Sequence, residues 1–253
     1  MKNPFSVEGK NIVVIGGTRG IGRAISLCLA GAGASLVAVY IRDEKAAEGL
    51  NQEKSQKGLS IDICRADVTS RKGLGDLGRF LDDWGRKISG LVISAATGVH
   101  KSYSELSARH FDWTFGLNVR GFFECLQLFL PRFAEKASVV ALSSQGAVQA
   151  IPLYSLIGAS KGALESLVRH LAVELAPRGI RVNALSPGSV LTDIWKTVPD
   201  SERRLDEAVR RTPLGRLVTA EEVGFAAQFL CSDASSAITG HTLVVDGGAR
   251  IVG

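Results

Sequence analysis

The sequence predicts a doubly wound α/β fold with a parallel sheet, because strand-like and helix-like segments alternate along the whole chain. Seven short runs are rich in Val and Ile and nearly continuous in apolar character, as expected of strands buried on both faces. Residues common in turns or at strand ends (Gly, Ser, Asp or Pro) bound each run. The predicted strands are residues 11–16, 35–41, 59–64, 90–96, 137–144, 180–186 and 241–247.

Helix-like segments lie between these strands. Residues 20–33 carry apolar side chains on one face at helical spacing. Thr219, followed three residues later by Glu222, forms a capping box that predicts a helix beginning there. The other predicted helices are 43–57, 70–84, 107–134 (two helices) and 153–176, and the capped helix is 219–231.

The 253 residues are expected to form a single domain, because α/β folds of about 250 residues often fold as one unit. Residues 193–215 interrupt the alternation, since they are polar, basic and rich in Pro. An insertion beside the carboxyl edge of a parallel sheet is where a lid would lie. We therefore predict a small helical substrate lid at about 193–215.

Composition excludes several classes of protein. The chain is 45% hydrophobic and 22% charged, unlike a disordered or fibrous protein, and no apolar stretch approaches the ~18 residues of a membrane span. The net charge is +5, but the basic residues are scattered, which argues against nucleic-acid binding.

Cysteines and histidines point to neither disulfides nor metals. The cysteines are far apart and lack a C-x-x-C pair, so we predict reduced core thiols, and the histidines share no metal-ligand spacing. Residues 1–10 lack the apolar segment of a secretory signal, and a cytoplasmic location is expected.

A glycine-rich segment follows the first predicted strand and opens the first predicted helix. Gly16, Gly20 and Gly22 have the spacing G-x-x-x-G-x-G. Glycine is needed where the backbone turns sharply, approaches a pyrophosphate closely and packs helix against strand. In this context the motif predicts the dinucleotide site of a Rossmann-type fold.

The second predicted strand indicates the kind of dinucleotide. It ends at Ile41-Arg42 without the Asp or Glu that often binds the ribose 2′-hydroxyl of NAD. Arg19 and Arg42 could hold a 2′-phosphate by charge-assisted hydrogen bonds, so NADP(H) is favoured over NAD(H). The alternative is that both arginines are ordinary solvated side chains.

Further motifs match one known family along nearly the whole chain. They are Asp67-Val68, Asn118-Val119-Arg120-Gly121, Ser143-Ser144, residues 183–192 (NALSPGSVLT) and residues 240–248 (GHTLVVDGG), together with the glycine segment. On these motifs the chain resembles the short-chain dehydrogenase/reductase family, although Ile15 replaces a Thr in the family's glycine motif. Many members are homotetramers, so the resemblance implies a homotetramer here.

The resemblance also implies which residues bind the cofactor. Asp67 would meet the adenine ring, residues 187–192 would pack on the nicotinamide, and Lys161 would hold the nicotinamide ribose. The full predicted set is Gly16, Thr18, Arg19, Gly20, Ile21, Gly22, Arg42, Asp67, Val68, Ile93, Ala95, Lys161, Pro187, Gly188, Val190 and Thr192.

One departure from the family concerns the catalytic tyrosine. The family places Tyr four residues before its Lys, but with Lys161 that position is Ile157. Tyr154 instead gives the spacing Y-x6-K. Separations of four and seven return to about the same helix face, so Tyr154 is expected to enter the same cleft from one turn further back. This spacing resembles the enoyl-acyl-carrier-protein reductase branch of the family.

A second departure follows the fourth strand, where N-N-A-G of the family is replaced by Ile93-Ser94-Ala95-Ala96 and then Thr97-Gly98. A bacterial enoyl reductase group carries a similar A-A-S-G, and residues 110–114 and 154–177 also resemble that group. The loss of both Asn side chains removes any proton relay built on them. Backbone contacts to the cofactor remain possible at Ile93 and Ala95.

These observations predict NADPH-dependent reduction of the C=C bond of a trans-2-enoyl thioester. The predicted catalytic residues are Tyr154, Lys161, Ser144 and Asn118. Tyr154 would donate a hydrogen bond to the developing enolate oxygen, and Lys161 would lower the pKa of the tyrosine. Moving the tyrosine by one turn, roughly 5 Å, makes room for a conjugated substrate.

Other interpretations remain open. The protein could be a carbonyl, ketoacyl or tailoring reductase, or a nucleotide-binding protein without catalysis. Ser144 could simply cap a strand end, and Tyr154 could be a packing aromatic. In the predicted lid, Arg203, Arg204, Arg210 and Arg211 are more simply a solvated face, and the alternative is docking of an acidic acyl carrier protein.

Overall fold

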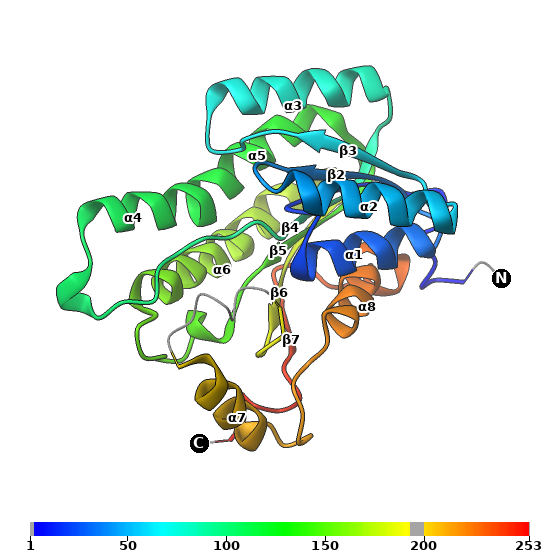
Figure 1. Cartoon of the computed structure of the whole chain (residues 1–253). Helices are drawn as coiled ribbons and strands as arrows, with labels where there is room; N and C mark the ends of the chain where they lie inside the picture. The colour runs from blue at the N-terminus through cyan, green and yellow to red at the C-terminus, as the bar shows by residue number, and fades with distance from the viewer. Residues whose placement is uncertain (1–2, 193–199, 253) are drawn as a thin grey trace.

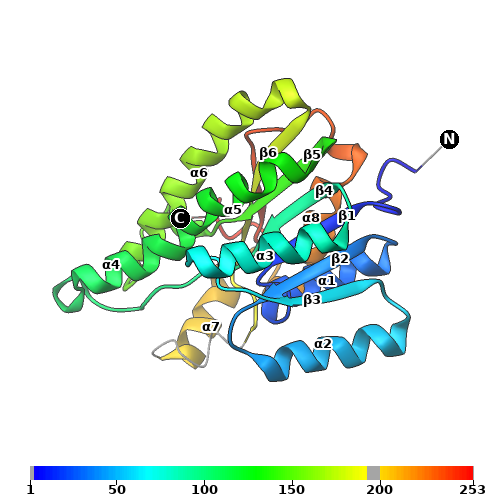
Figure 2. The same cartoon turned by 90° about the horizontal axis from the view of Figure 1, so that it is seen from above.

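A parallel sheet with strand order β3-β2-β1-β4-β5-β6-β7 forms the centre of the protein and carries helices on both faces (Figures 1 and 2). The computed structural model describes residues 3–192 and 200–252. This is the predicted Rossmann-type α/β fold. The strands are β1 (Asn11–Ile15), β2 (Ser35–Tyr40), β3 (Ile61–Arg65), β4 (Ile88–Ile93), β5 (Phe133–Leu142), β6 (Ile180–Pro187) and β7 (Thr242–Val245).

The helices lie close to their predicted ranges, except that the segment predicted as helical over 107–134 ends in β5, which begins at Phe133. The capping box is present: the Thr219 hydroxyl accepts from the Glu222 N–H at 3.1 Å, and the Glu222 carboxylate accepts from the Thr219 N–H at 2.9 Å. The helices are α1 (Gly20–Gly31), α2 (Glu44–Lys57), α3 (Arg71–Trp84), α4 (Ala108–Phe115), α5 (Phe122–Phe129), α6 (Ser155–Leu175), α7 (Ser201–Arg211) and α8 (Ala220–Cys231).

Successive residues of the central strand β1 face opposite helix layers, as the pleat of a strand requires. Ile12 and Val14 pack with α1, α2 and α8, whereas Val13 and Ile15 pack with α3, α5 and α6. All four side chains are almost completely buried. Burial on both sides explains why the run is apolar without alternation, and each side chain contributes about 1.5–3 kcal/mol to stability.

The strand order reverses between β1 and β4, because the chain continues from β1 toward β2 and from β4 toward β5. In such sheets, ligands bind outside the carboxyl ends of the strands at this switch point. The glycine segment, residues 94–98, Ser143-Ser144 and residues 187–192 all follow the carboxyl ends of neighbouring strands. The fold therefore brings the predicted site motifs to one edge.

Helix α7 stands apart from both helix layers (Figure 1). Within the predicted lid, residues 193–199 lie outside the described residues, and α7 with the turn after it occupies most of the rest. The Thr212 side chain approaches Gly247 so closely that a Cβ there would lie 2.6 Å from it, which anchors the end of α7 beside β7. Closure of this segment over a substrate stays a prediction.

Cysteine burial agrees with the prediction of core thiols. Cys64, Cys125 and Cys231 are buried, and Cys28 is half-buried. Among the described residues, no helix is long and apolar enough to cross a membrane.

Candidate active site at the carboxyl edge of the sheet

The glycine segment leaves a cradle made of backbone between α1 and the end of β4. Gly16 has φ of 80°, and a Cβ on it would lie 2.8 Å from the backbone nitrogen of Ala95. A Cβ on Gly22 would overlap the carbonyl oxygen of Gly16. The Gly16 N–H donates to the Val39 carbonyl at 2.8 Å, which ties the segment to β2. The backbone N–H groups at the start of α1 belong to this segment, and such a helix N-terminus suits a pyrophosphate.

The segment after β6 forms the opposite wall of this cradle. The Gly188 N–H donates to the Val245 carbonyl at 2.9 Å, and Val190 pairs with Val218. The Thr192 methyl lies 3.9 Å from the place of a Cβ on Gly20, so residues 187–192 reach back to the glycine segment. The buried hydroxyl of Ser186, at this end of β6, has no hydrogen-bond partner among the described residues. A bound polar molecule could supply that partner, and the wall fits the predicted nicotinamide side.

The two arginines predicted to set the preference for NADP over NAD lie at the carboxyl edge of the sheet. Arg19 precedes α1, Arg42 follows β2, and both are exposed. The neighbouring Asp43 carboxylate accepts from the Ala46 N–H at 3.0 Å and so caps α2. Asp67 accepts from the backbone and hydroxyl of Thr69 at 2.9 and 2.6 Å. Asp43, the acid nearest to the end of β2, is thus engaged in capping α2.

Tyr154 lies at the entrance of α6, where it is the N-cap residue, directly after Leu153 with φ of 64°. Its hydroxyl donates to Ser144 Oγ at 3.3 Å. The ring covers Gly146, on which a Cβ would lie 2.5 Å from the ring carbon Cε1. The helix predicted over residues 153–176 begins at Ser155, so Tyr154 is its N-cap residue and does not lie in its first turn. The hydroxyl nevertheless reaches Ser144, as the predicted site requires.

The ionisation of Tyr154 also differs from the prediction. Burial raises the pKa of Tyr154, and its hydrogen bond with Ser144 opposes this in part. A lowering by Lys161 is not found, because the Lys161 ammonium is directed at the Leu142 carbonyl, with an Nζ–O distance of 2.6 Å. Tyr154 therefore keeps its proton near neutral pH and acts as a hydrogen-bond donor.

Ile157 fills the place that the family gives to its tyrosine. It is 6% exposed and packs so tightly on Gly98 that a Cβ there would overlap its side chain. Lys161 is buried one turn further along α6, and burial lowers its pKa to about 8, opposed by the charge of Glu165. The site thus combines a hydrocarbon wall, a buried ammonium and a displaced phenol.

Asn118 reaches the site from the π-helical turn Gly116–Gly121 between α4 and α5. Its Oδ1 accepts from the Thr97 N–H, and its Nδ2 donates to the Thr97 carbonyl and to Ser160 Oγ, each at 2.9 Å. The amide thereby joins the segment after β4 to α6. A direct chemical role for Asn118 stays a prediction, and its contacts are those of a residue that positions others.

Two residues near the site escaped the sequence reasoning. The His100 ring lies 5.5 Å from the Tyr154 ring, between centroids, although the sequence offers no signal for this approach. Burial, and then the charge of Arg204, lower the pKa of His100. Glu165 lies four residues after Lys161, and that spacing was a usable signal.

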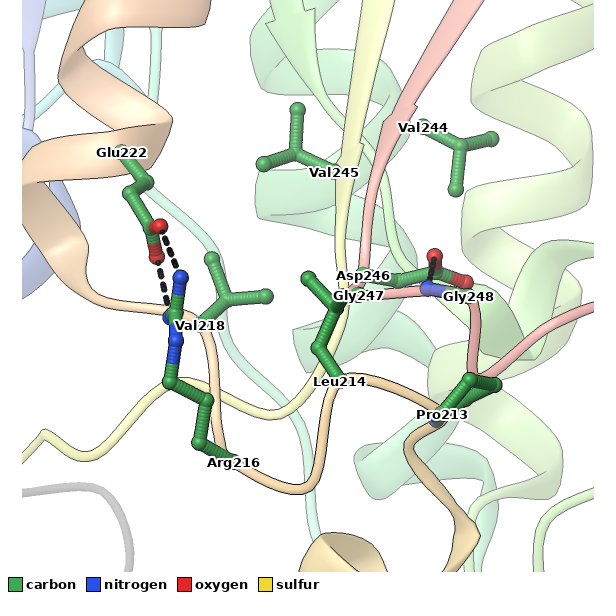
Figure 3. Close-up of a pocket in the computed structure, with 10 residues that line it drawn as sticks. All are labelled: Pro213, Leu214, Arg216, Val218, Glu222, Val244, Val245, Asp246, Gly247 and Gly248. Carbon is green, nitrogen blue, oxygen red and sulfur yellow. Dashed lines mark hydrogen bonds and ion pairs between the residues drawn. The ribbon is translucent and has the colours of Figure 1, made fainter.

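An open pocket of 530 Å³ lies at the end of β7 (Figure 3). The Arg216–Glu222 ion pair, at 2.6 Å, borders it, and Gly248 donates to Asp246 at 2.9 Å. None of its lining residues is Tyr154, Lys161 or a member of the glycine segment. Val218 and Val245 line this pocket and also contact residues 187–192, so the pocket adjoins that wall of the candidate active site.

A backbone cradle for a dinucleotide beside a tyrosine, a lysine and a serine defines the class of nicotinamide-dependent oxidoreductases. A family model described as enoyl-(acyl carrier protein) reductase matches residues 15–250. The chain belongs to the short-chain dehydrogenase/reductase family.

Its relatives within this family are mixed. The 1-cyclohexenylcarbonyl-CoA reductase of Streptomyces collinus is 34% identical over 95% of this chain and 86% of that protein. A 7α-hydroxysteroid dehydrogenase, solved with NADH and 7-oxo glycochenodeoxycholic acid, has a TM-score of 0.91 and 33% identity over 98% of each chain. A Beutenbergia cavernae protein assigned as an NAD(P)-dependent gluconate 5-dehydrogenase, with bound NADP, has a TM-score of 0.92 and 31% identity, covering 98% of this chain and 100% of that chain.

These similarities establish an NAD(P)-dependent oxidoreductase but do not extend to the narrower enoyl reductase resemblance. The relatives are not specifically enoyl-acyl-carrier-protein reductases, since a hydroxysteroid dehydrogenase is among them. They also carry NADH in one structure and NADP in another.

Proposed function

We propose that this protein uses NADPH to reduce the C=C bond of a trans-2-enoyl thioester. The observation that carries the proposal is the position of the tyrosine at the start of α6. Ile157 occupies the family's tyrosine position, while the Tyr154 hydroxyl is bound to Ser144 at the helix entrance.

The described residues have complementary roles toward the cofactor. Backbone N–H groups of residues 16–22 would bind the pyrophosphate, Lys161 the ribose hydroxyls, and residues 187–192 the nicotinamide amide and ring. When bound, NADPH supplies a hydride from its nicotinamide ring. The protein then has to orient the acceptor carbon and stabilise the charge that appears on the substrate.

The position of the donor distinguishes the two reductions. In a ketone, the carbon that receives hydride carries the oxygen that becomes negative. In an enoyl thioester, hydride adds to the β-carbon, and the charge appears on the thioester oxygen at the far end of the conjugated system. Tyr154 keeps its proton and can donate to that oxygen, while the buried Ile157 places no proton donor at the family's tyrosine position.

A paired kinetic assay tests the proposal. NADPH oxidation is followed with crotonyl-CoA and, separately, with acetoacetyl-CoA. We expect turnover of the enoyl thioester and little or none of the ketone. Turnover of the ketone alone would favour the second candidate, a carbonyl reductase, which the similarity to the hydroxysteroid dehydrogenase supports. If neither substrate is turned over although NADPH binds, a non-catalytic nucleotide-binding protein is favoured.

Preference for NADPH should depend on Arg42. Changing Arg42 to Ala is expected to raise the Kd for NADPH about tenfold and leave the Kd for NADH unchanged, because one charge-assisted hydrogen bond to the 2′-phosphate is lost. Fluorescence titration with both nucleotides measures this. Arg86→Ala is the matched control, since Arg86 is exposed, stacks on Trp84 and precedes β4 at the opposite edge of the sheet. Equal weakening of NADPH and NADH by the Arg42 change would contradict the proposed preference.

Carrier-protein docking and a homotetramer stay predictions. On α7, Arg203 pairs with Glu207 at 3.0 Å and with Asp200 at 3.8 Å, which fits the solvated-face interpretation. Arg210 and Arg211 are exposed in the last turn of α7 and are the residues still suited to an acidic partner.

A further inference from the structure

The carboxyl end of β5 makes successive side-chain contacts with α6 and its N-cap residue. The Leu142 carbonyl accepts from Lys161 Nζ at 2.6 Å, and Ser144 Oγ accepts from the Tyr154 hydroxyl at 3.3 Å. Between them, Ser143 Oγ donates to Glu165 Oε1 at 2.6 Å. The proposed chemistry uses the two outer contacts but gives no role to the middle one.

This middle contact is buried. Glu165 is 6% exposed and Ser143 is 5% exposed, close to the value of 4% for Lys161. A buried carboxylate carries a desolvation penalty that a hydrocarbon side chain of the same size would not. The Ser143 hydrogen bond compensates part of this penalty and fixes the carboxylate, but the contact alone does not explain why an acid occupies this position.

The charge of Glu165 provides an explanation. Residues four apart lie on the same face of a helix, so the carboxylate is held one turn from the Lys161 ammonium. Burial disfavours the charged form of Lys161, and the negative charge of Glu165 opposes that effect. Without it, Lys161 would lose its proton more easily.

We propose that Glu165, held in place by Ser143, is a positioning residue that keeps Lys161 positively charged at the cofactor site. The inference rests on the proposed role of Lys161 toward the cofactor, but it does not depend on which substrate bond is reduced. It adds to the site a residue that touches neither cofactor nor substrate.

The neighbouring ionisable groups are few among the described residues. Glu165 is the group whose charge acts on Lys161, and the Tyr154 phenol belongs to the N-cap residue of the same helix. At the end of β5 and directly after it, the neighbours are the Leu142 carbonyl and the Ser143 and Ser144 hydroxyls. From the segment after β4, His100 faces Tyr154, with Arg204 of α7 acting on it.

The test measures NADPH binding against pH by fluorescence, without substrate. In the wild-type protein, affinity is expected to fall as pH rises through about 8, where Lys161 loses its proton. In Glu165→Gln the midpoint of this fall should lie roughly one pH unit lower, because a nearby negative charge is gone. Glu165→Asp retains the charge and should return the midpoint toward the wild-type value.

Two further variants keep the test decisive. Ser138→Ala removes another buried hydrogen bond of β5, from Ser138 Oγ to the Leu230 carbonyl at 2.7 Å, and should leave the midpoint unchanged. If Glu165→Gln does not fold, the double variant Ser143→Ala/Glu165→Met replaces both partners by apolar groups, which is often nearly neutral for stability. It should show the same downward shift.

A folded charge-removing variant with the wild-type midpoint overturns the proposal. So does wild-type affinity that is constant through this pH range. Because substrate is absent, a protein that reduces ketones instead of enoyl thioesters would still show the predicted shift. Failure of the proposed function and failure of this inference are thereby separated.

Discussion

Changing Tyr154 to Phe is expected to lower kcat on an enoyl thioester by roughly 10²–10³-fold, the usual effect of removing one donor from a developing oxyanion. The ring and its packing over Gly146 are retained, so the Kd for NADPH should not change. Loss of the hydrogen bond to Ser144 should lower the free energy of unfolding by only about 1 kcal/mol.

Tyr103→Phe is the matched control for this variant. Tyr103 is 87% exposed in a short helical turn after β4, and its change should leave kcat unaltered. If the Tyr154→Phe protein has the kcat of the wild type, the phenol has no role in the reaction. A protein that folds but no longer binds NADPH would show that Tyr154 shapes the cofactor site instead.

Changing Gly22 to Ala is expected to weaken NADPH binding by roughly 100-fold or more. The added Cβ would overlap the Gly16 carbonyl oxygen, so the pyrophosphate segment must move away from α1. Losing two charge-assisted hydrogen bonds of about 1.5 kcal/mol each accounts for an effect of that size. Fluorescence or calorimetric titration with NADPH measures it.

Gly31→Ala is the control on the same helix. A Cβ on Gly31 would meet no atom within 4 Å, and helix propensity favours Ala by about 1 kcal/mol. This variant should bind NADPH like the wild type and be equally or more stable. Normal binding by Gly22→Ala would place the pyrophosphate somewhere other than this segment.

The fold could be predicted because the central strands carry one unambiguous pattern. In β1, each of Ile12 to Ile15 is buried, two on each face, and such a run fits a parallel sheet covered by two helix layers. In such a sheet the strand ends at one edge bring together the glycine segment, Ser143-Ser144 after β5, and residues 187–192. Most of the candidate site followed from topology in this way.

The details around Tyr154 could not be predicted, because they depend on tertiary contacts. Sequence spacing identified the residue, but not that Leu153 with positive φ ends the loop and makes Tyr154 the helix cap. The direction of its pKa shift depends on burial and on where Lys161 points, and spacing reports neither. Likewise, only the folded chain shows that the Asn118 amide is already occupied by Thr97 and Ser160.

The most direct test of C=C reduction is to determine which substrate carbon receives the hydride. Crotonyl-CoA is reduced with NADPH carrying deuterium at both C4 positions, and the product is analysed by mass spectrometry and NMR. The account predicts butyryl-CoA with a single deuterium on the β-carbon. Deuterium on a former carbonyl carbon, obtained with a keto substrate while crotonyl-CoA stays unchanged, would contradict it.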